Sequence, residues 1–89
     1  MVDKGYIYIL QNQKGNYYIG STKNLARRIE EHSSGVTKST RYKGPWKLVF
    51  CQEYEDLINA RRIEYKIKRL KNRNIVEKII REQKIRMGD

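Results

Sequence analysis

The hydrophobic and polar residues follow two different periods along the chain, one typical of strands and one typical of helices. Residues 6–10 and 16–20 are rich in aromatic and β-branched side chains, and they predict two strands. The polar stretch between them ends in glycine and predicts a hairpin loop. If the loop is centred near Gln13, Tyr8 and Tyr18 lie opposite each other and point to the same face of the sheet.

A third strand is predicted over residues 46–54. Its middle residues, 48–51 (Leu-Val-Phe-Cys), are all apolar, so both of its faces are expected to be covered. We therefore expect this strand inside the sheet rather than at an edge.

A first helix is predicted after Asn24, a residue type that caps helix N-termini. Its end is predicted at residues 33–35 (Ser-Ser-Gly). The spacing i, i+3, i+4, i+7, which places side chains on one helix face, is occupied by Leu25, Arg28, Ile29 and His32. An arginine and the single histidine of the chain thus share a face with two apolar residues. Residues 36–45 form a polar and basic loop.

The last third of the chain has a helical period. An apolar stripe begins after Asp56 and consists of Leu57, Ala60, Ile63, Ile67 and Leu70. Residues 72–74 interrupt it, and a last helix carries Ile75, Val76, Ile79 and Ile80 on one side. The predicted fold is α/β: a small three-stranded, mostly antiparallel sheet flanked by helices, in the order β-β-α-β-α-α. We expect residues 1–89 to form a single domain.

Charge indicates the kind of partner. The chain has 20 Lys and Arg against 10 Asp and Glu, a net charge of +10. Residues 60–89 hold 11 of the basic and four of the acidic residues. A basic half with a helical pattern favours a nucleic-acid partner, with DNA expected before RNA. The alternative is a solvated helix surface rich in lysine.

Composition excludes several other classes of protein. The single cysteine, Cys51, excludes an intramolecular disulfide and a cysteine-based zinc cluster. The sequence contains no apolar run of membrane-spanning length and no signal-peptide core at residues 1–4. We expect a cytoplasmic protein without a membrane partner, and a monomer by default.

An ordered set of short motifs runs through the chain. It consists of Tyr6-Ile7-Tyr8, Tyr18-Ile19-Gly20, then Arg28 and His32 at ten and fourteen residues after Tyr18, and a later helical glutamate, Glu64. This set resembles the GIY-YIG endonuclease superfamily, in its small stand-alone single-domain branch. Residues 44–49, Ala60 and Lys68 extend the resemblance over nearly the whole chain. The first motif departs by one residue, since Tyr6 stands where the family name has glycine.

The resemblance implies a metal-dependent endonuclease that hydrolyses DNA phosphodiester bonds. Substrate choice would rest on DNA structure or be of low sequence specificity, as in repair or recombination. The expected cofactor is Mg²⁺, with Mn²⁺ as an alternative. Glu64 would hold the metal, since one carboxylate plus waters suits Mg²⁺. Periodicity alone favours a surface glutamate paired with Arg61 or Lys68.

The other candidate catalytic residues each have a structural alternative. Arg28 would neutralise the scissile phosphate through its planar guanidinium, or pair with Glu31, and Arg27 lies off the stripe. Tyr8 and Tyr18 would position or deprotonate the nucleophilic water, and which tyrosine does which stays open. A nearby arginine and a cation would favour the phenolate. His32 would accept a proton or orient a tyrosine hydroxyl.

Candidate substrate-binding residues complete the site. Gly20 would permit a close backbone approach at the strand end. The basic residues expected to contact phosphates are Lys38, Arg41 and Lys43 of the loop, together with Lys68. Family members place an asparagine after the glutamate, and Asn72 and Asn74 do not match that spacing. Two other classes of function stay open: a non-catalytic basic nucleic-acid-binding module, and an interaction protein that docks an acidic partner.

Overall fold

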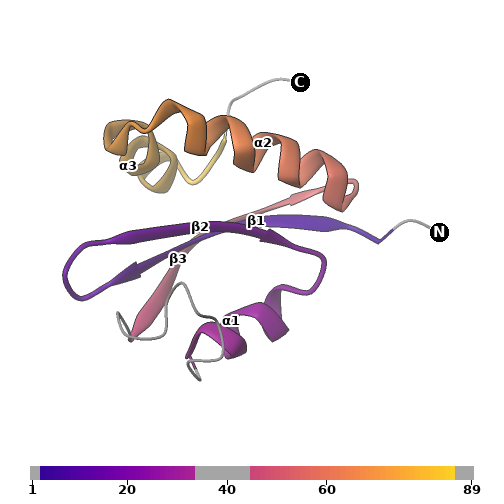
Figure 1. Ribbon diagram of the computed structural model, residues 1–89, viewed down its shortest axis with the longest axis horizontal. Helices are drawn as coiled ribbons and strands as arrows, with labels where there is room; N and C mark the ends of the chain where they lie inside the picture. The colour runs from indigo at the N-terminus through magenta and orange to yellow at the C-terminus, as the bar shows by residue number, and fades with distance from the viewer. Residues whose placement is uncertain (1–2, 34–44, 86–89) are drawn as a thin grey trace.

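The computed structural model of the protein describes residues 3–33 and 45–85. Its elements are β1 (Gly5–Asn12), β2 (Tyr17–Thr22), α1 (Leu25–Ser33), β3 (Trp46–Tyr54), α2 (Leu57–Leu70) and α3 (Arg73–Glu82). The predicted order β-β-α-β-α-α and the predicted fold class are confirmed. The sheet lies between two helical layers, with α1 on one side and α2 and α3 on the other (Figure 1).

The three strands are ordered β2-β1-β3 and are antiparallel throughout. The prediction that residues 46–54 form an interior strand is therefore wrong, because β3 is an edge. Strand β1 has the central place, and its residues from Ile7 to Leu10 are at most 1% exposed. In β3, by contrast, Leu48 is 36% exposed and Cys51 is also exposed. An apolar run was not enough to identify the central strand, because β3 is covered at only some of these positions.

The β1–β2 hairpin has a different register from the one predicted. Tyr8 pairs with Gly20, and Leu10 pairs with Tyr18. The turn lies further along the chain because the Asn12 side chain accepts hydrogen bonds from the backbone N–H groups of Lys14 and Asn16. Since the shift is an even number of residues, Tyr8 and Tyr18 still point to the same face.

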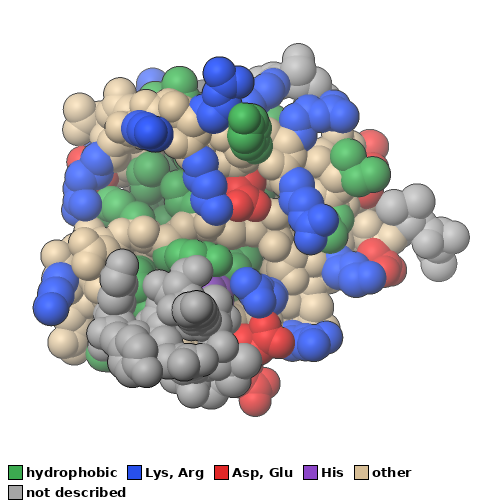
Figure 2. Space-filling view, in the orientation of Figure 1, with side chains coloured by type: hydrophobic (Ala, Val, Ile, Leu, Met, Phe, Trp, Pro, Cys, Tyr) green, Lys and Arg blue, Asp and Glu red, His purple; other side chains and the backbone are tan. Residues whose placement is uncertain are grey.

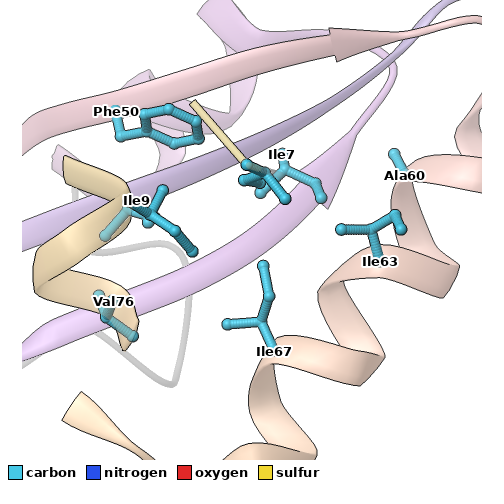
Figure 3. Close-up of a cluster of buried hydrophobic side chains, with 9 residues drawn as sticks. Ile7, Ile9, Phe50, Ala60, Ile63, Ile67 and Val76 are labelled. Carbon is cyan, nitrogen blue, oxygen red and sulfur yellow. The ribbon is translucent and has the colours of Figure 1, made fainter. Parts of the chain in front are cut away.

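One apolar layer holds the sheet against α2 and α3. Ile7 and Ile9 of β1 pack with Phe50 of β3, and the helices add Ala60, Ile63, Ile67, Val76 and Ile79. Figure 3 shows the labelled members of this layer gathered between the sheet and the two helices. Leu70, the last residue of the predicted apolar stripe, is 49% exposed and lies outside this layer. It is the last residue of α2, and the backbone turns away at Lys71 (φ 48°).

Polar caps set where the helices begin. Asn24, Asp56 and Asn72 each accept a hydrogen bond from a backbone N–H two or three residues ahead, at 3.1, 2.8 and 2.9 Å. The predicted cap of α1 is thus present, and the polar residues 72–74 end one helix and start the next.

The segment after α3 returns to β3. The Gln83 side chain donates to the carbonyl of Val49 at 3.2 Å, and the Ile85 backbone N–H donates to Gln52 Oε1 at 2.9 Å. Ile85 is 4% exposed and completes the apolar layer, a contribution that the sequence pattern did not indicate. Among the described residues, no helix has the length and apolar character needed to cross a membrane.

Candidate active site

Tyr8 and His32 form the buried centre of the site. Tyr8 is 0% exposed and His32 3% exposed, and the Tyr8 hydroxyl lies 3.0 Å from His32 Nε2. Tyr8 lies on β1 between Ile7 and Ile9, so strand alternation turns it away from the apolar layer and toward α1. His32 comes from the last turn of α1, on the face predicted from its spacing.

Gly20 makes room for this pair. A Cβ atom at Gly20 would lie 2.4 Å from the Tyr8 hydroxyl oxygen and 2.6 Å from its ring carbon Cζ. Any other residue would displace the tyrosine. The group that lies against this glycine is thus a side chain, the Tyr8 phenol, rather than a backbone.

The protonation states of the two rings follow from burial and from Arg28. Burial raises the pKa of Tyr8 above its usual value, although hydrogen bonding to Arg28 acts in the opposite direction. Burial also lowers the pKa of His32, and the positive charge of Arg28 lowers it further. At neutral pH Tyr8 is a phenol and His32 a neutral imidazole, so the phenol can donate to Nε2. Arg28 favours the phenolate as expected, but burial outweighs it.

Tyr18 lies in the middle of the cluster and is only partly buried. Its ring centroid is 4.7 Å from that of His32, 6.2 Å from that of Tyr8 and 6.4 Å from that of Trp46. Since Tyr8 is fully covered, Tyr18 is the more accessible of the two candidate tyrosines.

Arg28 lies one turn before His32 on α1. Its side chain is 33% exposed, and its Nη1 atom lies 2.9 Å from Glu31 Oε1. Arg27 pairs with the other oxygen of Glu31 at 3.2 Å but is 74% exposed. Hydrogen bonding to Arg28 lowers the pKa of Glu31. The ion pair and the contact with Tyr8 are thus both present at Arg28, and the contrast with Arg27 that the helix pattern predicts is visible in their exposure.

Glu64 lies on the opposite side of the sheet, on α2. Its side chain is 17% exposed, Lys68 Nζ is 2.6 Å from Oε2, and the Ser21 hydroxyl donates to Oε1. Ser21 pairs with Ile7 and so faces α2, whereas its neighbour Gly20 pairs with Tyr8 and faces α1. The two halves of the site therefore meet around the edge strand β2.

Ser21 was missed by the sequence analysis. The signal available was its place directly after Gly20, since alternation turns the next residue of a strand to the other face. That face is the one covered by α2, where Glu64 lies.

The donor set at Glu64 suits a cation that keeps most of its water. Among the described residues, no group of three or more His, Cys, Asp or Glu is placed to hold a metal ion. A transition-metal site of several protein ligands is thus not formed by these residues. Mg²⁺ binds through one or two carboxylates, with waters and substrate phosphate completing its shell, and Glu64 with Ser21 fits that pattern.

The structure brings together Tyr8, Tyr18, Arg28 and His32 on one face, with Gly20, Glu64 and Lys68 at the edge strand. Lys68 Nζ is 5.9 Å from the centre of the Tyr18 ring and 2.6 Å from Glu64 Oε2, so it lies near residues of both halves. Lys38, Arg41 and Lys43 fall outside the described residues. Figure 2 shows Lys and Arg side chains spread over the helical layer of α2 and α3 on the face drawn.

Comparison with known proteins identifies the class of this site. Residues 4–78 match the GIY-YIG catalytic domain, and the chain belongs to the GIY-YIG family. This is a nuclease domain that acts on nucleic acid and generally depends on a divalent metal.

The chain is also similar to small single-domain proteins. It is 41% identical over 69 residues to the UPF0213 protein BH0048 of Halalkalibacterium halodurans, covering 76% of this chain and 73% of that protein. It is 38% identical over 79 residues to the UPF0213 protein of Pectobacterium carotovorum, covering 88% and 79%. The solution NMR structure of BH0048 from Bacillus halodurans has a TM-score of 0.59, with 36% identity, and covers 90% of this chain and 85% of that one. These names state no activity.

Proposed function

We propose that the protein is a Mg²⁺-dependent endonuclease that hydrolyses DNA phosphodiester bonds, choosing its substrate by structure or with low sequence specificity. The observation that carries the proposal is the convergence on one edge strand. The Tyr8–His32 pair, with Arg28, lies on one side of β2, and Glu64 lies on the other. Membership of the GIY-YIG family supports the same reaction class.

Glu64 is the residue proposed to hold the metal, with Ser21 orienting its carboxylate. A bound divalent cation would supply Lewis-acid stabilisation of charge on the phosphate and the departing oxygen. Mn²⁺ is expected to substitute, because it also accepts oxygen ligands.

Of the two tyrosines, Tyr18 is the one we assign to position or deprotonate the attacking water, because it is the more accessible. Tyr8, which has no exposed surface, acts as a positioning residue: its hydroxyl contacts His32 Nε2 and fixes the orientation of the imidazole. His32 is neutral at pH 7 because burial lowers its pKa, so its Nε2 atom can accept the hydrogen bond of the Tyr8 hydroxyl.

Arg28 is proposed to bind a non-bridging oxygen of the scissile phosphate. Its guanidinium keeps its charge, and the contact with Tyr8 and the ion pair with Glu31 hold it in place. A fixed cation of this kind stabilises the charge that develops in the transition state.

A non-catalytic nucleic-acid-binding module is the second candidate. The observation that favours it is that Glu64 and Arg28 both take part in ion pairs within the chain. In that case, binding would be electrostatic, salt-sensitive and independent of Glu64.

A cleavage assay separates the two candidates. Labelled duplex, single-stranded, flapped and branched DNA, with RNA beside them, are incubated with Mg²⁺, with Mn²⁺ and with chelator. Metal-dependent cleavage should fall by about 10²-fold or more in Glu64→Ala and Arg28→Ala, the size expected for losing one essential electrostatic group. Arg27→Ala, the matched control on the same helix, should cut at close to the wild-type rate.

Circular dichroism of each variant checks that its fold is unchanged. Full metal-dependent activity in purified Glu64→Ala and Arg28→Ala would refute the endonuclease mechanism. Salt-sensitive binding by a wild type that cuts none of the substrates would support the binding module instead.

A further inference from the structure

Both oxygens of the Glu64 carboxylate already have a partner inside the chain. Lys68 Nζ lies 2.6 Å from Oε2, and the Ser21 hydroxyl donates to Oε1. Ser21 is neutral and can stay in place when a cation binds. Lys68 cannot, because its ammonium lies where the cation would meet Oε2 and two positive charges repel each other.

The Lys68 ammonium can move away from the Glu64 carboxylate. Its side chain is 51% exposed, whereas that of Glu64 is 17% exposed. The pair has i,i+4 spacing on α2, and ion pairs of this kind with an exposed partner are weak. The lysine stem is flexible, so the ammonium can turn without moving the helix.

We propose that Lys68 exchanges partners: it neutralises Glu64 in the metal-free protein and transfers to a phosphate oxygen of the nucleic acid when a divalent cation takes Glu64. This inference rests on the proposed function. Its support is the place of the ammonium, which lies 2.6 Å from the Glu64 carboxylate and 5.9 Å from the centre of the partly exposed Tyr18 ring. A lysine released there stays beside the phosphate, and lysine binds phosphate as a point charge.

The exchange makes metal and nucleic acid bind cooperatively through one side chain. Metal binding frees the cation that the phosphate needs, and by linkage a bound phosphate draws Lys68 away from Glu64. Removing Lys68 therefore has effects of opposite sign. Metal binding to the free protein becomes tighter, while the gain in nucleic-acid affinity on adding metal is lost.

The test measures both bindings separately from cleavage. Mn²⁺ is the metal probe, and its free concentration is followed by electron paramagnetic resonance in the wild type, Lys68→Met, Arg61→Ala and Glu64→Gln. Methionine keeps the length of the side chain and removes the charge. Arg61 is an exposed cation one turn before Glu64 on the same helix, so Arg61→Ala reports the general effect of removing a nearby charge.

Lys68→Met should bind Mn²⁺ roughly 2- to 5-fold more tightly than the wild type, the range that corresponds to a weak ion pair. Arg61→Ala should change the affinity by less than Lys68→Met does. The affinity for a short labelled duplex is then measured by fluorescence anisotropy, with and without Mn²⁺, in a Tyr18→Phe background to suppress cutting. Mn²⁺ should increase that affinity in the Tyr18→Phe protein but not when Lys68→Met is added.

Two negative results have different meanings. If Lys68→Met changes the Mn²⁺ affinity no more than Arg61→Ala does, and Mn²⁺ still increases the affinity for the duplex when Lys68→Met is present, while Glu64→Gln loses Mn²⁺ binding, the exchange is wrong and the metal site at Glu64 stands. If Glu64→Gln binds Mn²⁺ as the wild type does, the metal assignment is wrong and the exchange is wrong with it. Thermal unfolding of Lys68→Met and Glu64→Gln beside the wild type separates either result from misfolding.

Discussion

Ile7 and Ile9 of β1 point into the apolar layer under α2 and α3, whereas Tyr8, between them, points toward α1 and contacts His32. All three side chains are 0% exposed, so burial does not distinguish the two faces. What differs is the way each face is held together. The first is held by contact area, and the second by a hydrogen bond, a guanidinium and a glycine that leaves room for the phenol.

The comparison teaches that, within β1, the side chains that face α2 and α3 serve folding, whereas the one that faces α1 belongs to the candidate site. A face held by contact area tolerates a change of shape at a cost in stability. A face held by directed polar contacts loses its geometry when one partner moves. Substitutions on the two faces should therefore differ in kind, and four experiments test that contrast.

The largest effect is expected on the apolar face. Ile9→Ala should lower the free energy of unfolding by about 2–5 kcal/mol, because it leaves a cavity against Phe50 and α3. Tyr18→Phe, on the other face, should change stability by about 1 kcal/mol or less, the value of one hydrogen bond, and should greatly slow cleavage. Chemical denaturation with a cleavage assay checks both. Equal destabilisation by Ile9→Ala and Tyr18→Phe would contradict the contrast between the two faces. If Ile9→Ala does not fold, Ile9→Val makes the same test with a smaller loss of side-chain volume.

Gly20→Ala should act on the face of the sheet that carries Tyr8 and is covered by α1. The added methyl would lie 2.4 Å from the Tyr8 hydroxyl oxygen, so the phenol must move away from His32. We expect cleavage to fall roughly 10- to 100-fold, corresponding to the 1–3 kcal/mol typical of overpacking. The NMR titration of His32 should change at the same time. An unchanged histidine titration together with unchanged activity would contradict the role given to this glycine.

Ser21→Ala should have a smaller effect, since it removes one hydrogen bond to the Glu64 carboxylate and no charge. A hydrogen bond to a charged group is worth about 1.5–3 kcal/mol. Because Ser21 is only partly buried, the lower end of that range applies, and cleavage at limiting metal should fall roughly tenfold. High Mg²⁺ should restore part of the rate if the serine orients the ligand. Ser21→Thr keeps the hydroxyl and should be close to the wild type. A Ser21→Thr protein as impaired as Ser21→Ala would point to packing instead.

The smallest effect is a pH dependence of stability caused by His32. Its pKa in the folded protein is lowered from the usual 6.5, first by burial and then by Arg28. Below pH 6.5 the unfolded chain therefore binds more protons than the folded one. As the pH is lowered from 6.5, the free energy of unfolding decreases until the pKa of His32 in the folded protein is passed. His32→Gln should remove this slope. Because the chain has a single histidine, NMR titration reads its pKa directly. A pKa above 6.5 would reverse the sign and refute the assignment.

The fold could be predicted to a large extent because its signals are local. Periodicity located all six elements, and Asn24, Asp56 and Asn72 mark helix starts by cap chemistry. The order of the strands in the sheet, by contrast, is not determined by a local signal. Strands β1 and β3 are both apolar in the middle, and which of them is central depends on the helices packed against each face. The hairpin register was missed because it depends on the hydrogen bonds of one side chain, Asn12.

The residues of the candidate site could be named from the sequence, but their arrangement could not. Spacing on α1 placed Arg28 and His32 on one face, and the structure shows both near Tyr8. That Tyr8 is covered and Tyr18 is accessible could not be read from two similar strand positions. The bond from Ser21 to Glu64 spans 43 residues of sequence, and no local pattern contains such a contact.

The return of the chain to β3 after α3 has a consequence for where this domain can be cut. The match to the catalytic domain ends at residue 78. Ile79 and Ile85 lie beyond that point, are 6% and 4% exposed, and belong to the apolar layer. A fragment trimmed to the matched residues would therefore expose the underside of the sheet and lose the last turn of α3. The smallest unit that keeps this core extends at least to Ile85, so the end of the matched region is a poor guide for designing shorter versions of the protein.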